Sequence, residues 1–309
     1  MVMCVQQYSI YSEKKVIIMS NRVIITTDTG SDLRPENLKK FHIDGMIPFH
    51  ITLGDKSYED FYECQPHDLF RFFDETKQVP KTAACTPNDY FEFFEPFAAQ
   101  GCDIVHIAMN SVFSSSYNHS LTAAEEIKEK YGTSVYSVDT YTLTGAQALM
   151  AIRAAELRDS GMGAKEISEE IVRMVPHVRT NFLLGGMNYA AKGGRCSMLV
   201  AFGANLLKLF PMMHIDEKGI ITAPKKFRGS VESVQNQYMD YVLDLAEKYA
   251  DYKRVIIGYT SDNKKLIDNM HRRLKEFGKF EEIVESVTNC TTATHGGPNT
   301  IYMIFADKY

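Results

Sequence analysis

Four short polar segments of the chain carry side chains that can hold an anion by hydrogen bonds. Residues 28–32 and 111–116 each follow an apolar strand pattern, residues 81–87 precede a helix pattern, and residues 294–298 place His295 beside two glycines. Hydroxyl groups, imidazole and the amides at helix N-termini are suited to binding a carboxylate or a phosphate. Taken singly, each segment is equally well explained as a helix cap, a turn or a structural histidine.

The common catalytic and cofactor motifs are absent from the sequence. There is no GxxxxGK[ST] or GxGxxG pattern for a nucleotide, no GxSxG for a hydrolase serine, and no HExxH or zinc-type cysteine spacing. A glycine turn at residues 192–197 contains Arg195, which could pair with a surface carboxylate. We therefore expect no catalytic residue, no metal and no cofactor in this chain.

Composition narrows the class of protein further. The 309 residues are 45% hydrophobic and 24% charged, with a formal net charge of -5 and no long basic cluster, which argues against nucleic-acid binding. Six scattered cysteines predict free thiols in a reducing cytoplasm rather than a disulfide framework. No apolar run approaches the roughly 18 residues of a membrane span, so stable membrane insertion is not expected. Residues 1–21 resemble no signal peptide, and we expect a poorly ordered extension there.

Apolar strand patterns alternate with helix patterns in the first half of the chain. Strands are predicted at residues 23–27, 103–109 and 134–138, and each leads into a polar turn and a helix, which is typical of a parallel α/β sheet. The second half predicts a hairpin at 210–223, helices at 230–249 and 263–277, and strands at 254–259, 283–287 and 301–305. We expect an extension at 1–21, an N-terminal α/β domain at 22–175 and a smaller C-terminal α/β domain at 176–309.

Six segments, in order along the chain, together resemble the DegV family, whose best understood members are the fatty-acid-binding subunits of bacterial fatty acid kinase. Residues 28–33 resemble its D-S-T-S-D-L opening, 110–117 its S-S-G-L-S-G-T-Y turn, 192–197 its K-G-G-R-I-S block and 294–298 its A-H-x-G block. Residues 81–87 stand at its T-S-Q-P block and 225–229 at its arginine segment after the hairpin. The chain departs from these motifs at Ala83, Ala84, Cys85, Val112 and Ser115.

The resemblance implies a two-domain DegV fold with a long-chain fatty acid between the domains and its tail in the first. It implies that the carboxylate is held by Thr82, Ser114 and His295, with a supporting pocket of Asp28, Thr29, Ser31, Ala83, Ser111 and Phe113. Arg195 and Arg228 are expected to serve a separate ATP-dependent kinase that forms the acyl phosphate. The chain itself is then a cytoplasmic substrate carrier and not an enzyme.

Two other functions stay open at the level of sequence. DegV proteins resemble part of the dihydroxyacetone kinase family, so a phosphotransferase acting on a small polar substrate is one alternative. Such an enzyme needs a nucleotide or phosphohistidine site, which nucleotide binding would reveal. A binder of another amphiphile is the second alternative, and extraction of the bound ligand separates it from a fatty-acid carrier.

Overall fold

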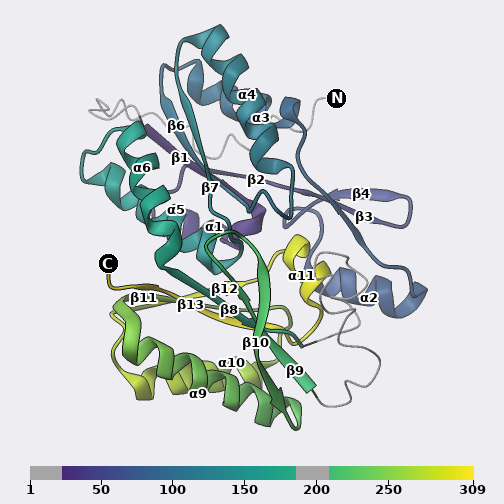
Figure 1. Cartoon of the computed structure of the whole chain (residues 1–309). Helices are drawn as coiled ribbons and strands as arrows, with labels where there is room; N and C mark the ends of the chain where they lie inside the picture. The colour runs from purple at the N-terminus through teal and green to yellow at the C-terminus, as the bar shows by residue number, and fades with distance from the viewer. Residues whose placement is uncertain (1–22, 186–208) are drawn as a thin grey trace.

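The computed structural model describes residues 23–185 and 209–309 (Figure 1). A four-stranded parallel sheet in the order β2-β1-β6-β7 forms the centre of the first half. Ile25 of β1 lies in register with Val105 of β6, and both are buried, as expected for strands covered on both faces. The predicted parallel α/β sheet is therefore confirmed. Its strands are β1 (Val23–Asp28), β2 (Gly45–Ile47), β6 (Asp103–Ala108) and β7 (Val135–Asp139).

Helices cover both faces of the parallel sheet. The pair α3 and α4 pack on each other over one face, and α5 crosses the other face, where it contacts β1 and β6. The α5 helix also contacts β8, β11 and β13, so it lies between the two large sheets (Figure 1). Its many buried alanines allow this close approach on all sides. The helices are α1 (Pro35–Lys40), α3 (Pro87–Ala98), α4 (Ser116–Tyr131), α5 (Gly145–Asp159) and α6 (Ala164–Met174), with a 3-10 turn η2 (Thr29–Ser31) after β1.

A small antiparallel sheet in the order β4-β3-β5 projects from the first half. Residues 81–83 form its strand β5, whereas the sequence pattern alone indicated only a loop before a capped helix. Thr82 lies in register with Ile51 of β3, and Thr86 does cap α3, accepting a hydrogen bond from the Asp89 amide at 3.2 Å. The elements are β3 (His50–Leu53), β4 (Lys56–Glu59), β5 (Lys81–Ala83) and the adjacent α2 (Pro66–Thr76).

The second half forms a six-stranded sheet in the order β10-β9-β8-β13-β11-β12, antiparallel except for the β11–β12 pair. The predicted hairpin, helices and strands all occur, and α9 packs on α10 across one face of this sheet. The strands are β8 (Val178–Leu183), β9 (Leu209–Ile215), β10 (Ile221–Arg228), β11 (Ala250–Tyr259), β12 (Glu282–Val287) and β13 (Ile301–Asp307). The helices are α9 (Val231–Tyr249), α10 (Lys264–Phe277) and α11 (Cys290–Gly296), and the 3-10 turn η3 (Val175–His177) precedes β8.

The largest hydrophobic core joins the two halves. Ile25 and Val105 of the first sheet belong to one buried cluster with Ile256, Tyr302 and Ile304 of the second. Burying side chains of this size contributes roughly 1.5–3 kcal/mol each. The division near residue 175, between α6 and β8, stays a prediction, and it would cut through this shared core. The expected extension at 1–21 lies outside the described residues. No described helix combines the length and apolar character needed to cross a membrane.

Candidate functional site

Thr82 and His295 meet across the boundary between the small sheet and the second half of the chain. Thr82 Oγ1 lies 3.2 Å from His295 Nε2, although the two residues are 213 positions apart. Both residues are partly buried, so one side of the pair is open to a ligand or solvent. A hydroxyl and an imidazole at this distance can both donate hydrogen bonds to one anionic oxygen.

The short helix α11 positions His295, and buried carboxylates hold that helix in place. Asp60 accepts hydrogen bonds from the amides of Cys290 at 2.7 Å and Thr291 at 3.0 Å. Burial raises the pKa of Asp60, while the hydrogen bonds from Thr291 and Cys290 act in the opposite direction. A carboxylate beside the N-terminus of a helix also interacts favourably with the helix dipole. His295 therefore stands on a helix that the N-terminal half anchors.

Asp32 makes a second connection between the halves. Its Oδ1 accepts hydrogen bonds from the Asn289 amide at 2.9 Å and from Thr292 Oγ1 at 3.1 Å, while Tyr302 donates to Oδ2 at 3.2 Å. Burial raises the pKa of Asp32 to about 8, against these hydrogen bonds and the charge of Arg34. The sequence places Asp32 in a polar cluster, but its partners in the second half are visible only in the structure.

Asp28, Thr29 and Ser31, expected to support the pocket, make hydrogen bonds within the protein. Asp28 is fully buried and accepts hydrogen bonds from the Met109 amide and Gln147, each at 2.9 Å. Burial raises the pKa of Asp28 to about 6, although these donors favour the ionised form. Thr29 Oγ1 accepts from the Phe49 amide at 3.0 Å, and Ser31 Oγ donates to the Asp28 carbonyl at 2.8 Å. They hold the end of β1 against its neighbours, and a direct ligand contact stays a prediction.

The serine-rich turn at residues 110–117, called the serine turn below, leads into α4. It lies beside residues 81–87, the segment that contains Thr82. Ser114 is partly buried, and its Oγ lies 2.7 Å from Ser116 Oγ and 3.2 Å from the Ser116 amide. In the first turns of α4, His119 Nδ1 donates to the Cys85 carbonyl at 2.7 Å. This bond ties α4 to the segment that follows β5, so Ser114 and Thr82 lie on directly connected segments.

The remaining predicted residues occupy varied positions. The Ser111 amide donates to Asp139 Oδ1 at 3.2 Å, and Phe113 packs partly buried against the aromatic core under α3 and α4. Ala83 is exposed in β5, and Arg228 is exposed at the end of β10. Arg195 lies outside the described residues, so its relation to the site stays a prediction.

The departures in the serine turn do not require altered backbone geometry. Ser115 has a φ of −75°, and Val112 is not among the residues with positive φ. Neither position therefore demands the glycine that the family motif carries there. Val112 is also half exposed, at 51%. Substitution of both glycines is compatible with the turn as it stands.

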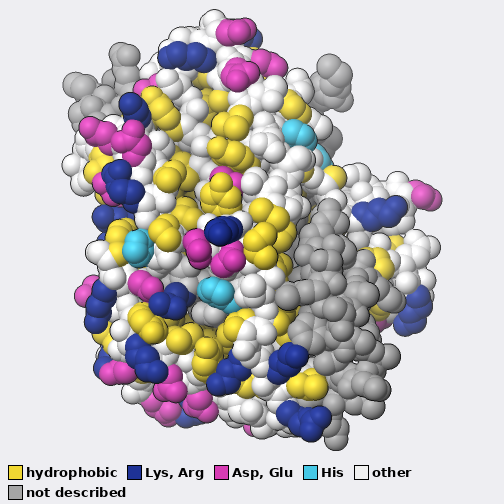
Figure 2. All heavy atoms as spheres, in the orientation of Figure 1, with side chains coloured by type: hydrophobic (Ala, Val, Ile, Leu, Met, Phe, Trp, Pro, Cys, Tyr) yellow, Lys and Arg dark blue, Asp and Glu magenta, His cyan; other side chains and the backbone are white. Residues whose placement is uncertain are grey.

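A separate polar cavity of about 160 Å³ lies between the β7–α5 loop, β8 and β9. Its lining includes the hydroxyl residues Thr140, Thr142 and Thr180, together with His214. The cavity cannot be predicted from local residue patterns, because its lining comes from segments that are distant in the chain. Its polar walls are unsuited to an acyl tail. On the face shown in Figure 2, acidic and basic side chains lie interspersed rather than gathered by sign.

Comparison with known proteins gives the family. Residues 22–308 match the family described as "Uncharacterised protein, DegV family". The chain belongs to the DegV family. A curated relative, the "Fatty acid-binding protein" of Thermotoga maritima, is 26% identical over 287 residues, covering 91% of this chain and 96% of that protein. The resemblance seen in the motifs is thereby confirmed over almost the whole chain.

Solved DegV structures share the fold. A fatty-acid-binding DegV protein from Thermus thermophilus superimposes with a TM-score of 0.81 at 22% identity, covering 93% of this chain and all of that one. The Streptococcus pneumoniae Fatty Acid Kinase (Fak) B3 protein, loaded with linoleic acid, has a TM-score of 0.79 at 20% identity and covers 93% and 99%. The two-domain DegV fold is confirmed, and the DegV proteins in these structures bind fatty acids.

Proposed function

We propose that this chain binds a long-chain fatty acid and holds its carboxylate with Thr82, Ser114 and His295. The observation that carries the proposal is the 3.2 Å approach of Thr82 Oγ1 to His295 Nε2, which joins two of the three residues. The fatty acids in related DegV structures support the choice of ligand. Ser114 would join the pair through the connection of α4 to the Cys85 carbonyl.

The affinity is divided between the tail and the head group. Burial of an acyl chain of about sixteen carbons contributes roughly 0.8 kcal/mol per CH₂, or about 12 kcal/mol before association costs. Each hydrogen bond to the carboxylate contributes about 1.5–3 kcal/mol. We place the tail beside the aromatic core under α3 and α4, which Phe113 joins directly before Ser114. A small polar site is then sufficient to orient the acid.

We further propose that the chain presents the carboxylate to a separate ATP-dependent kinase, which forms the acyl phosphate. The name of the Streptococcus pneumoniae neighbour supports a kinase partner. Arg195 and the exposed Arg228 are the residues proposed to serve that partner. The four described cysteines are free thiols, in keeping with a proposed cytoplasmic location.

Native mass spectrometry before and after delipidation tests the fatty-acid proposal. We expect co-purified long-chain acid, its loss on delipidation, and uptake of one acid per chain on addition. The double variant Ser114→Ala, His295→Ala should retain the acid more weakly than the original chain. A chain that never carries or takes up such an acid would overturn the proposal, and nucleotide binding in its place would favour the phosphotransferase alternative. Unchanged retention in the double variant would reject the head-group site alone.

A further inference from the structure

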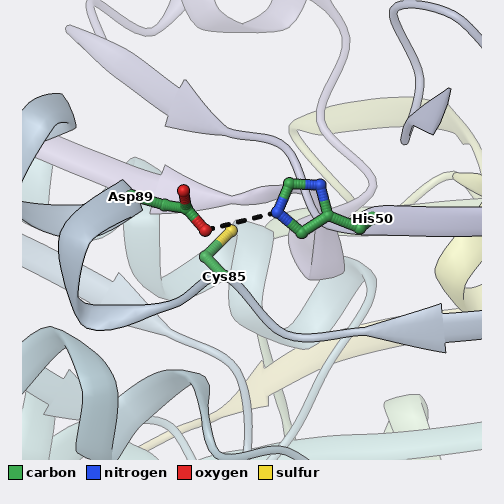
Figure 3. Close-up of side chains that lie close together, drawn as sticks. All are labelled: His50, Cys85 and Asp89. Carbon is green, nitrogen blue, oxygen red and sulfur yellow. Dashed lines mark hydrogen bonds and ion pairs between the residues drawn. The ribbon is translucent and has the colours of Figure 1, made fainter. Parts of the chain in front are cut away.

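Three metal-ligating side chains meet close to the proposed carboxylate site. His50, Cys85 and Asp89 each offer one ligand atom, and these atoms all lie within 4.8 Å of one another. Figure 3 shows the sulfur of Cys85 beside the line that joins the His50 imidazole to the Asp89 carboxylate. Sequence spacing does not reveal the group, because His50 in β3 lies far along the chain from Cys85 and Asp89, which stand together at the start of α3.

Local structure holds each of the three residues in place. His50 begins β3 and lies in register with Ala83 of β5, two residues before Cys85. Asp89 stands in the first turn of α3, where its Oδ2 accepts a hydrogen bond of 2.7 Å from the Thr86 amide. Burial raises the pKa of Asp89, but hydrogen bonds from Thr86 and His50 outweigh it, so the pKa is lowered and the carboxylate is ionised.

The combination of ligand atoms selects a class of ion. Imidazole nitrogen and cysteine sulfur are typical ligands of Zn²⁺ and related transition metals, whereas Mg²⁺ and Ca²⁺ prefer oxygen alone. Zn–N and Zn–O bonds of about 2.0–2.1 Å place neighbouring ligand atoms of a tetrahedron about 3.3–3.4 Å apart. His50 Nε2 lies 3.3 Å from Asp89 Oδ2, which matches that spacing.

We propose that His50, Cys85 and Asp89 bind a divalent transition-metal ion of the Zn²⁺ class. The side chains of His50 and Asp89 are 37% and 35% exposed, so an ion can enter from solvent, while Cys85 closes the buried side. Glu59 lies opposite His50 in the β3–β4 register, on the same face of the sheet, and is a candidate fourth ligand. The alternative fourth ligand is water.

Binding replaces two existing interactions. The hydrogen bond between His50 Nε2 and Asp89 Oδ2 would exchange for two metal bonds, and the Cys85 thiol, which donates to the Pro48 carbonyl at 3.0 Å, would form a metal–sulfur bond. The thiol proton passes to solvent, and the proton that His50 Nε2 donates to Asp89 leaves that nitrogen for solvent as well, since a thiolate and an unprotonated imidazole nitrogen are the forms that bind metal. Cys85 stands at a position where this chain departs from the DegV motif, so the proposed site is a property of this chain rather than of the motif.

Cobalt titration tests the site directly. Chain freed of metal with a chelator should bind one Co²⁺, with a near-ultraviolet thiolate-to-cobalt absorption and the visible bands of tetrahedral cobalt, and Zn²⁺ should displace it. Cys85→Ser should lose the thiolate absorption, whereas Cys102→Ser, which removes another buried thiol, should keep it. His50→Gln should weaken Co²⁺ binding at least about 100-fold, the upper end of losses caused by removing outer-shell partners.

The result can be separated from folding and from the fatty-acid proposal. If the circular dichroism of Cys85→Ser differs from that of the folded chain, the test of the metal site depends on His50→Gln, which changes a half-exposed residue. Absence of the thiolate absorption from the unaltered chain, its persistence in Cys85→Ser, or unchanged affinity in His50→Gln would each overturn the site. Fatty-acid uptake is measured on the same samples. None of the three proposed metal ligands belongs to the group of residues proposed to hold the fatty-acid carboxylate.

Discussion

At the scale of single residues, Thr82 allows the sharpest test of the carboxylate site. Thr82→Val keeps the shape of the side chain and removes only the hydroxyl that approaches His295. We expect the affinity for a long-chain fatty acid to fall about 10- to 100-fold, because one hydrogen bond to a charged group contributes about 1.5–3 kcal/mol. Displacement of a fluorescent fatty acid from delipidated protein measures the change.

A threonine on the exposed surface supplies the matched control for this substitution. Thr122 lies on α4, and its hydroxyl donates to the Asn118 carbonyl at 3.4 Å. Thr122→Val should therefore leave fatty-acid affinity as it was. Equal affinities for Thr82→Val, Thr122→Val and the unaltered chain would remove Thr82 from the site.

At the scale of elements, the contact between β11 and β13 depends on one glycine. Gly258 lies in register with Tyr302, and a Cβ added at Gly258 would overlap the Tyr302 ring. Tyr302 is buried and donates to Asp32, so it has little room to move. We expect Gly258→Ala to lower the free energy of unfolding by at least about 1–3 kcal/mol, measured by urea denaturation.

Gly163→Ala is the control substitution for Gly258→Ala. It precedes α6 with a φ of −75°, and an added Cβ would lie 3.6 Å from the nearest side-chain atom, Glu166 Oε2. Because Gly163 is the N-cap of α6, a position where glycine is favoured over alanine, Gly163→Ala should lower the free energy of unfolding by only roughly 0.5 kcal/mol. A loss as large as that of Gly258→Ala would mean that strand overlap is not the cause.

At the scale of the whole molecule, Asp32 links the two halves and makes their association dependent on pH. Its pKa is about 8 in the folded chain, raised by burial, against an ordinary value of 3.8. Between these values the folded state binds more protons than the unfolded state, so this group's contribution to stability falls as pH rises from about 4 to 8. The slope is at most on the order of 1.4 kcal/mol per pH unit.

Replacing this carboxyl with a neutral amide tests the dependence. Between pH 5 and pH 8, the melting temperature of Asp32→Asn should fall less than that of the unaltered chain. Circular dichroism measures both melting temperatures. Asp55→Asn, at an exposed turn between β3 and β4, should keep the pH profile of the original chain. Parallel profiles for Asp32→Asn and the original chain would contradict the raised pKa.

The shared core predicts that the first half does not fold independently. A fragment of residues 22–175 would lose Ile256, Tyr302 and Ile304 from the largest buried cluster and expose its apolar partners. We expect this fragment to show no cooperative thermal transition alone and to regain one when co-expressed with residues 176–309. A cooperative melt of the isolated fragment would support two independently stable domains divided near residue 175.

Elements with long, local residue patterns could be predicted from the sequence. Strand β1 and helices α9 and α10 follow the predicted segments closely, because periodicity and caps such as Ser230 and Asn263 act within a few residues. The ordered motifs also identified the family and the residues proposed for the carboxylate. None of this depends on knowing which segments touch.

The contacts among those residues could not be predicted from the sequence. Strand β5 and helix α11 are too short to give a periodic pattern, and pairing with β3 and the contacts of Asp60 form them. The approach of Thr82 to His295, and the approach of His50 to Cys85 and Asp89, follow from the same long-range packing. Contacts between distant segments depend on the register and docking of whole elements, which local residue patterns do not encode.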